Sequence, residues 1–525
     1  MMLRVPADNE TFAVAAVHSY NVAIREDQRL FLTRVATQPV SEKTKMDNLN
    51  RTRRSRDTEI SRRGFIGGAA ATTAALTVVP RHVLGLRGSA PPSDKLNVAV
   101  IGTGGQGKHN IRALLGHADV QVMAICDVNE ESDYSRFYYG GTAGRKPVLE
   151  LIEKHYASQK SGGRYKDCAC YVDFRRMLEK EKAIDAVLVA TPDHIHAVAT
   201  MAAIKHGKHV YCEKPLTHSI HEARKVTEAA RRAGVATQMG NQGHSGEGIR
   251  LTVEWIRDGA IGDVREVHSW SHTGVDWAGY RVARPKETPP VPPGLDWDLW
   301  LGPAQHRPYH LAYAPYNWRG WWDFGTGAIG DMACHNMDPA FWALDLGHPV
   351  SVEASSTGVN PETTPFGSII HYQFPARRNM PPVRVTWYGG GLMPPRPEEL
   401  EPGRELTGGG NGILFVGDKG KIMCPGWGGN PRIIPEAKMR AYTLPPKTIP
   451  RSNGHHRDWI DACKGGKPAS SNFDYAGPMT EVILLGNVAL RTGKRLSWDG
   501  ANMKATNAPE ADKYIRSEYH NGWTL

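Results

Sequence analysis

Lys214 is a candidate for proton handling or substrate binding because of where it falls in the sequence. It stands in Glu213-Lys214-Pro215, directly after the apolar run 209–212, which predicts a strand. Open α/β sheets bind ligands at the C-terminal ends of their parallel strands. A lysine there donates a hydrogen bond to a substrate oxygen, or carries a proton if burial lowers its pKa. Taken alone, the tripeptide fits a solvent-facing turn equally well.

Asp331 and His335 form a second candidate pair, within the helical pattern 327–338. Residues four apart share one face of a helix. A carboxylate beside an imidazole orients the ring and raises its basicity, as general acid–base catalysis requires. Trp318 and Arg319 lie just upstream in an aromatic-rich stretch. Aromatic faces and fixed donors suit sugar or polyol binding, although a surface pair and a core aromatic cluster would explain the same residues.

The pattern Gly102-x-Gly104-x-x-Gly107 predicts the dinucleotide site that would serve this chemistry. It follows the apolar run 96–101 and precedes the helical pattern 106–115. Strand, glycine turn and helix in this order bring backbone N–H groups and a helix N-terminus to a pyrophosphate. Asp127 ends the next predicted strand, about 20 residues after the last glycine, where a ribose hydroxyl acceptor belongs. We therefore expect cofactor contacts from the whole turn, comprising Gly102, Thr103, Gly104, Gly105, Gln106 and Gly107, and from Asp127.

Further polar residues follow the other predicted strands at the same edge. We expect a loop containing a His-x-His pair to line the cofactor pocket, and the ends of two later strands to add contacts. Two histidines at this spacing could also bind a metal, but no third ligand of suitable spacing accompanies them, and we expect no metal site. The expected rim residues are Thr191, Pro192, His194, His196, Glu213, Asn241 and Gln242.

Composition excludes several classes of function. The chain has 525 residues, 22% charged and 40% hydrophobic, which is typical of a globular protein. Residues 1–90 hold 14 basic and 8 acidic residues, so only +4 of the net charge of +10 belongs to the remaining 435. No basic stripe interleaved with aromatics is present, and we expect no nucleic-acid partner. The seven cysteines lack a disulfide-like or zinc-like spacing.

The N-terminal region resembles an export signal. Arg62 and Arg63 precede the small-residue apolar run 67–79, which is too short to cross a bilayer as a mature helix. Paired arginines before such a run predict a twin-arginine leader and a periplasmic location. A merely flexible N-terminus is the alternative. No later stretch resembles a membrane span.

Alternating strand and helix patterns predict an N-terminal Rossmann domain with a doubly wound parallel sheet, over residues 91–240. Within it, residues 129–163 form an irregular segment that lies beside the adenosine end of the cofactor or on the solvated surface. Longer, two-sided strand patterns then predict a C-terminal α+β domain, residues 241–500, with a large, mostly antiparallel open sheet. Residues 1–90 are the predicted extension and signal, and 501–525 a tail. An open sheet of this kind favours a homodimer or homotetramer.

Together, the glycine turn, Thr191-Pro192-Asp193-His194-x-His196, Glu213-Lys214-Pro215 and Asp331-x-x-x-His335 resemble the glucose–fructose oxidoreductase/inositol dehydrogenase/MocA family (Gfo/Idh/MocA). The resemblance covers roughly residues 95–500. It implies Lys214 as the catalytic lysine beside substrate and nicotinamide, and His335 as the proton acceptor or donor. Asp331 would orient His335 or bind substrate.

The resemblance implies an exported oxidoreductase that transfers hydride between a nicotinamide cofactor and a sugar, polyol or glycoside. Asp127 favours NAD over NADP because it would repel a 2′-phosphate, although Arg136 or Arg145 could accept one. A glycoside hydrolase that uses NAD for transient oxidation and elimination is an alternative. A non-catalytic nucleotide-binding protein is a third possibility, against which the intact Lys214, Asp331 and His335 argue.

Overall fold

The computed structural model describes residues 94–159, 165–273, 283–407 and 410–525. The paired arginines, the apolar run after them and the predicted domain 1–90 therefore lie outside the described residues. Among the helices described, none is long and apolar enough to cross a membrane.

The first sheet is entirely parallel, as the sequence predicts, and has the strand order β5-β2-β1-β6-β7-β8. Its strands are short and almost wholly buried because helices cover both faces. The chain adds β2 and β5 on one side of β1, and then β6, β7 and β8 on its other side. The order of the strands therefore switches between β1 and β6, and doubly wound sheets bind ligands at this position. The strands are β1 (Leu96–Ile101), β2 (Val120–Cys126), β5 (Ala169–Tyr171), β6 (Ala186–Val189), β7 (His209–Cys212) and β8 (Thr237–Met239).

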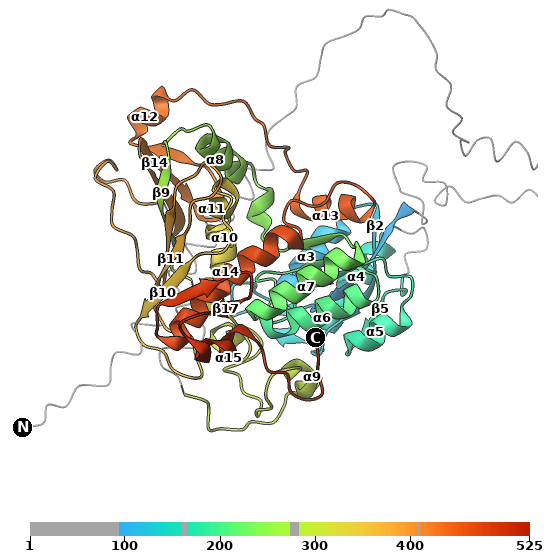
Figure 1. The fold of residues 1–525 in the computed structure, drawn as a ribbon. Helices are drawn as coiled ribbons and strands as arrows, with labels where there is room; N and C mark the ends of the chain where they lie inside the picture. The colour runs from blue at the N-terminus through green and yellow to red at the C-terminus, as the bar shows by residue number, and fades with distance from the viewer. Residues whose placement is uncertain (1–93, 160–164, 274–282, 408–409) are drawn as a thin grey trace, which may run out of the picture. The chain divides into compact units, whose positions relative to one another are not determined.

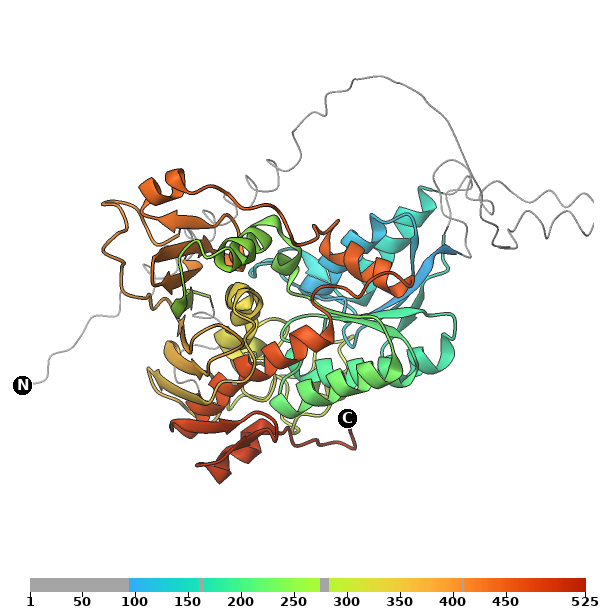
Figure 2. The ribbon, with the colours of Figure 1, turned by 45° about the horizontal axis from the view of Figure 1, so that its top comes forward.

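Two helical layers enclose this sheet (Figures 1 and 2). Side chains of α5 (Phe174–Lys180), α6 (Asp193–Lys205) and α7 (Ile220–Ala233) pack on one face. Those of α3 (Gly105–Leu115) and α4 (Arg145–Ala157) pack on the other, joined by α13 (His455–Cys463). Helix α13 lies within the predicted C-terminal domain, residues 241–500. Residues of that predicted domain therefore also cover part of the first sheet.

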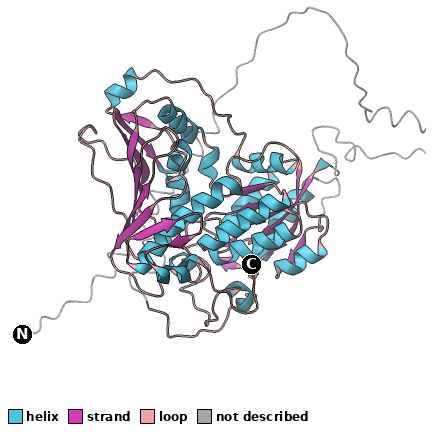
Figure 3. Ribbon diagram, in the orientation of Figure 1, coloured by secondary structure: helices cyan, strands magenta, loops and turns pink. Residues whose placement is uncertain are grey.

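The second sheet has nine strands in the order β15-β14-β13-β9-β12-β11-β10-β16-β17. All neighbouring pairs are antiparallel except β9 with β12, which agrees with the predicted mostly antiparallel sheet (Figure 3). The strands are β9 (Val264–Ser271), β10 (Ser351–Ser356), β11 (Ser368–Phe374), β12 (Val383–Gly389), β13 (Asn411–Gly417), β14 (Gly420–Pro425), β15 (Arg432–Ile434), β16 (Leu496–Asp499) and β17 (Lys504–Ala505).

Helices α10 (Gly327–Asn336) and α14 (Phe473–Thr492) connect the two sheets. Helix α14 contacts α7 on one side and α10 and β10 on the other. It begins at Phe473, where the Asn472 side chain caps it by accepting from the Asp474 N–H. The remaining helices are α8 (Glu247–Arg257), α9 (Trp297–Leu301), α11 (Asp338–Ala343), α12 (Glu436–Ala441) and α15 (Asp512–Ile515).

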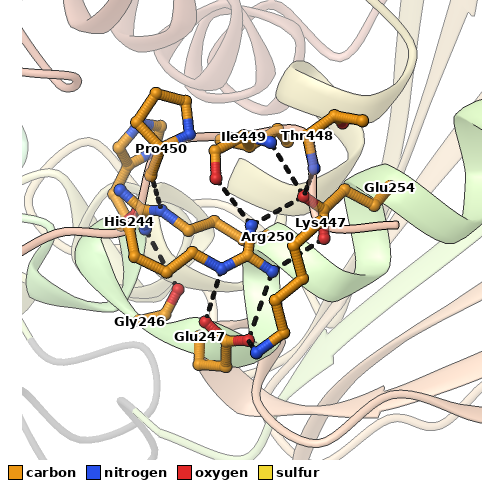
Figure 4. Close-up of polar contacts among 10 residues, drawn as sticks. His244, Gly246, Glu247, Arg250, Glu254, Lys447, Thr448, Ile449 and Pro450 are labelled. Carbon is orange, nitrogen blue, oxygen red and sulfur yellow. Dashed lines mark hydrogen bonds and ion pairs between the residues drawn. The ribbon is translucent and has the colours of Figure 1, made fainter. Parts of the chain in front are cut away.

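A polar cluster fixes α8 to the proline-rich loop 445–450 (Figure 4). The buried Glu254 carboxylate accepts from the N–H groups of Thr448 and Ile449, at 2.7 and 2.8 Å, and from the guanidinium of Arg451 at 2.6 Å. Arg250 donates to the carbonyls of His244, at 2.8 Å, and of Pro450. These contacts therefore fix α8, the α-helix that follows β8, against the loop 445–450.

We expect Glu254→Ala to lower the free energy of unfolding by about 2–4 kcal/mol, because it leaves two N–H groups and a guanidinium without their acceptor. Glu247 is the matched control, since it pairs with the same Arg451 from the same helix but its side chain is 43% exposed. Glu247→Ala should cost less than about 1 kcal/mol. Urea unfolding at neutral pH measures both, and equal losses would contradict the assignment of the stability to Glu254.

The hydrogen bonds from Arg451 chiefly lower the pKa of Glu254 to about 2. A carboxyl group with a depressed pKa in the folded state contributes its stability above the pKa of the unfolded chain. That contribution falls as the pH drops from about 4.5 towards 2. The difference in stability between the parent protein and the Glu254→Ala variant should therefore shrink over this pH range.

Candidate active site

The glycine turn after β1 is tightly packed, and its glycines are sterically required. Gly102 has a φ of +89°, and a Cβ there would lie 2.5 Å from the Ala190 carbonyl oxygen. A Cβ on Gly107 would lie 2.0 Å from the Gly102 oxygen, so α3 can approach the turn only without a side chain there. Helix α3 begins at Gly105 with no acidic side chain in its first turn. The first turn of the helix therefore contributes no negative charge of its own that would repel a phosphate.

Asp127 follows β2 and is held rigidly beside this turn. One of its oxygens accepts from the Thr103 N–H at 2.6 Å and from the Thr103 hydroxyl at 3.1 Å, and the other accepts from the Asn129 N–H at 2.9 Å. Burial raises the pKa of this carboxyl, against those hydrogen bonds. Thr103 thus positions Asp127 and does not itself line the cavity.

One cavity collects most of the predicted site residues. It extends from the glycine turn along the C-terminal ends of β1, β2, β6 and β7 to α10. The predicted residues that line it are Gly102, Gly104, Gly105, Gln106, Asp127, Thr191, Pro192, His196, Glu213, Lys214, Trp318, Arg319 and Asp331. Six others lie outside its lining, namely Thr103, Gly107, His194, Asn241, Gln242 and His335.

Lys214 and Asp331 form an ion pair inside this cavity. The Lys214 Nζ lies 2.6 Å from Asp331 Oδ1, and the two side chains are only 17% and 15% exposed. Burial disfavours the charged lysine, but Asp331 and Tyr139 outweigh it, and the pKa of Lys214 is raised. The expectation that burial could lower this pKa is thus wrong for this arrangement. Lys214 is protonated and suited to donating a hydrogen bond.

Arg319 is the second cation beside Asp331, with its Nε 3.5 Å from Asp331 Oδ1. Its guanidinium lies between the rings of Tyr316 and Trp318, 4.3 Å from each centroid. Burial works against ionisation of Asp331, but Lys214 and Arg319 overcome it and lower its pKa. This end of the cavity therefore presents the Asp331 carboxylate, two cations and an aromatic wall.

His335 lies one helical turn beyond Asp331 on α10, as predicted, but the two side chains do not pair. Asp331 is hydrogen-bonded to Lys214 instead, and the buried Nδ1 of His335 has no hydrogen-bond partner. Burial, with the nearby charge of Lys214, lowers the pKa of His335 to about 3. The imidazole is therefore neutral. Helical spacing correctly placed both residues on one face of α10. It could not show that the Asp331 carboxylate binds a lysine 117 residues away in the sequence.

Glu213 connects three elements around the base of the cavity. Its Oε1 accepts from Gln106 at 3.1 Å, from Asn110 at 2.8 Å and from Gln242 at 3.1 Å. These bonds fix the end of β7 against α3 and the turn after β8. Burial raises the pKa of this carboxyl, and the hydrogen bonds from Asn110 and Gln106, with the charge of Lys214, oppose the rise. Gln242 thus acts on the cavity through Glu213 and does not line it.

The His-x-His pair lies in the first turn of α6 and not in a loop. His196 contacts the carbonyl oxygens of Pro215, at 2.7 Å, and Thr191, at 2.9 Å. It therefore supports the loop that carries Lys214. His194 contacts the carbonyls of Trp300 and Phe324 and lies outside the cavity. Within the described part of the chain, no group of three His, Cys, Asp or Glu side chains is arranged to hold a metal ion.

Asn241 also differs from the prediction of a cofactor contact. Its amide donates to Asp338 at 3.0 Å and accepts from the Ser471 hydroxyl at 2.6 Å, and it is fully buried. It joins the end of β8 to α11 and to the loop before α14. The strand end is correctly placed, but its side chain faces into the protein.

Five aromatic residues line the cavity that the sequence did not indicate as site residues, one of them Phe174 at the start of α5. Trp300 comes from α9, and Trp523 from the C-terminal tail, where the ring lies 4.4 Å from the Arg175 guanidinium. Tyr134 and Tyr139 come from the irregular segment after β2. These two tyrosines lie over the glycine turn and beside Arg319, while Tyr138 between them in sequence is exposed; the position of the segment beside the adenosine stays a prediction. The clustering of tyrosines was a signal, whereas Trp523 had none.

Comparisons with known proteins agree with this geometry. Residues 96–241 match the model of the Gfo/Idh/MocA oxidoreductase family, NAD-binding Rossmann fold, and residues 248–375 match its C-terminal α/β domain. The two matches together span more than half of the chain. The WlbA dehydrogenase from Bordetella pertussis, solved with NADH and UDP-GlcNAcA, has a similar fold. Its TM-score is 0.51 at 18% identity, over 77% of this chain and 99% of that one.

Two curated relatives match shorter stretches. The 1,5-anhydro-D-fructose reductase of Ensifer adhaerens is 28% identical over 166 residues, 31% of this chain and 38% of the relative. A glycosyl hydrolase family 109 protein of Shewanella sp. is 24% identical over 222 residues, 39% of this chain and 44% of the relative. The chain thus covers less than half the length of either. The two family models and the cavity geometry lead to the same conclusion: this chain belongs to the Gfo/Idh/MocA family of oxidoreductases, with an NAD-binding Rossmann fold as its first domain.

Proposed function

We propose that this protein transfers hydride between NAD and a hydroxyl or carbonyl carbon of a sugar, polyol or glycoside. The observation that carries the proposal is the buried Lys214–Asp331 pair, which shares one cavity with the glycine turn and Asp127. The likeness to the anhydrofructose reductase supports a sugar-type substrate.

The glycine turn and Asp127 fit a nicotinamide dinucleotide. The turn excludes side chains where backbone must approach a pyrophosphate, and Asp127 offers a fixed acceptor for a ribose hydroxyl. Because that carboxylate would repel a 2′-phosphate, we favour NAD over NADP. The cofactor supplies the hydride chemistry. The protein binds and orients the cofactor and the substrate, and its side chains move the proton.

Lys214 and His335 share the work on the substrate hydroxyl in this proposal. Lys214, protonated and held by Asp331, donates to the substrate oxygen and stabilises the negative charge that develops there. His335 is neutral with a buried Nδ1 that has no hydrogen-bond partner, and in this proposal it accepts the hydroxyl proton once it reaches the cavity, whose lining it does not join in this structure. Trp318 and Arg319 supply the aromatic face and the fixed donor for a sugar ring.

Replacing Lys214 tests its role directly. We expect Lys214→Met to lower kcat/KM by about 10²–10⁴-fold, because it removes the donor to the reacting oxygen. Affinity for NADH, measured by titration, should change far less. Lys225→Met is the control, since Lys225 pairs with Glu228 on the outside of α7. Unchanged kcat/KM in Lys214→Met would overturn the assigned role.

The pH profile tests the pairing of Lys214 with Asp331. The charge of Asp331 is the largest influence that raises the pKa of Lys214, so Asp331→Asn should lower that pKa. A lysine with a lowered pKa loses its proton at lower pH. The alkaline limb of the kcat/KM profile should therefore move to lower pH in Asp331→Asn than in the parent enzyme. If the alkaline limb stays at the same pH in Asp331→Asn, the titration of Lys214 does not cause it, and the proposed pairing is contradicted.

A second candidate is a glycoside hydrolase that oxidises its sugar transiently and regenerates NAD within each cycle. The likeness to the glycosyl hydrolase family 109 protein favours it, and the same residues would serve. Mass spectrometry of nucleotide released from the purified full-length protein, with a panel of sugars and glycosides, separates the two. Net nicotinamide reduction supports the oxidoreductase, and release of a free sugar without an electron acceptor supports the hydrolase. Absence of any NAD(H) binding would overturn both.

We also propose export by the twin-arginine pathway to the periplasm, supported by Arg62, Arg63 and the apolar run 67–79. Replacing both arginines by lysine should keep the full-length protein in the cytoplasm, as fractionation and immunoblotting would show. Periplasmic recovery of the double variant would refute the pathway.

A homodimer or homotetramer formed through the outer face of the nine-stranded sheet is our expectation for the assembly, testable by light scattering.

A further inference from the structure

The segment after β2 forms a small hairpin that carries tyrosines onto the glycine turn. Its strands are β3 (Ser132–Asp133) and β4 (Thr142–Ala143), paired over two residues each. Burial raises the pKa of the Tyr134 hydroxyl, and the nearby backbone N–H of Gly105 acts against that rise. A Cβ on Gly104 would lie 2.7 Å from that hydroxyl oxygen. The Tyr134 hydroxyl thus fills the space that the absent side chain of Gly104 leaves open.

Tyr139 covers the next residue of the turn. A Cβ on Gly105 would lie 2.1 Å from Tyr139 Cδ2, so the ring packs directly on the start of α3. Tyr134 and Tyr139 also pack edge to face, with centroids 6.2 Å apart. Both tyrosines are therefore placed against the two glycines that precede the first turn of α3.

The Gly105 N–H is among the free backbone donors at the start of an eleven-residue helix, where phosphate groups bind. In this structure the Tyr134 hydroxyl and the Tyr139 ring lie over Gly104 and Gly105 at this end of the helix. We propose that the hairpin occupies the pyrophosphate-binding face of the glycine turn, so that the hairpin and NAD compete for it. NAD then binds only when Tyr134 and Tyr139 move off the turn. This inference rests on the proposed use of NAD.

The hairpin is constructed in a way that permits this movement. Its tip contains Gly140 and Gly141, with φ values of +61° and +63°, and a Cβ on either would meet nothing within 4 Å. Tyr138 at the tip is 58% exposed. The paired strands span only two residues each and form a sheet separate from the Rossmann sheet, so the movement breaks no strand pairing of that sheet. It does require loss of contacts such as that of Lys108 Nζ with the Thr142 carbonyl, at 2.6 Å.

The same hairpin reaches the substrate side of the cavity. Phe137 stacks on Tyr316 with ring centroids 4.7 Å apart, and the Tyr139 hydroxyl lies 3.5 Å from the Arg319 guanidinium. Arg319 in turn lies 3.5 Å from Asp331. Displacement of the hairpin by nucleotide therefore removes a contact from Arg319. Binding of NAD before substrate follows from this link, because the arginine is released only after the nucleotide enters.

NADH titration of the full-length protein, followed by nicotinamide fluorescence, tests the competition. Tyr134→Phe keeps the ring and removes the competing oxygen, so it should bind NADH about two- to tenfold more tightly than the parent. Tyr138→Phe is the control on the same hairpin, and it should bind like the parent. Equal or weaker binding by Tyr134→Phe would overturn the proposal.

Hydrogen exchange on the unmodified protein gives a second readout that needs no variant. The Tyr134 N–H donates to the Gly141 carbonyl across the hairpin at 2.7 Å. NADH should speed exchange of residues 132–143 and slow exchange at Gly105. Slower exchange in both segments would mean that the hairpin closes on the nucleotide, and would overturn the competition. If neither the parent nor Tyr134→Phe binds NADH, the proposed function itself fails.

Discussion

The ion pair between Lys214 and Asp331 is the interaction on which the arrangement of the site depends. Lys214 ends a strand of the first sheet, and Asp331 lies on α10, the helix that packs against the second. Removing two charges from water is costly, and a buried pair returns that cost only with good geometry and further hydrogen bonds. The pair therefore adds little net stability. Its effect is to fix a charged donor at a defined place above the glycine turn.

Neighbouring polar contacts keep Lys214 in that position. Glu213, immediately before it, is held by three amide donors, and the carbonyl of Pro215, immediately after it, contacts His196. The lysine backbone is thus anchored on both sides while its side chain remains free to follow Asp331. A catalytic group needs this kind of support because small displacements from the reacting atom cost much of its effect.

The sequence predicted the parts of this site that depend on local pattern. Short apolar runs located the strands of the first sheet, and the glycine spacing located the turn, because each requires only a few neighbouring residues. Side-chain partners were less predictable. Asp331 was expected beside His335 and instead pairs with Lys214, and Asn241 reaches a strand end but faces Asp338. Such choices are made between segments more than 90 residues apart.

Insertions and termini were the least predictable elements for the same reason. Tyr134 and Trp523 reach the cavity from segments without a regular pattern, and the contacts that place them come from distant elements. Trp523 is held through Arg175 of α5, which no spacing in the tail could indicate. Periodicity reports which face of an element is buried, but it carries no information about which distant segment covers that face.

The charges around Asp331 suit the proposed reaction, in which a substrate oxygen becomes negative. Lys214 and Arg319 together carry one more positive charge than Asp331 neutralises, while His335 beside them is held neutral. When an alcohol is oxidised, its oxygen loses a proton and its carbon loses a hydride. Negative charge develops on the oxygen along the way. Fixed cations lower the energy of that state without reorganising, and a neutral imidazole can take the proton that a protonated lysine cannot. Under the proposed function, these opposite protonation states would give Lys214 the donor role and His335 the acceptor role.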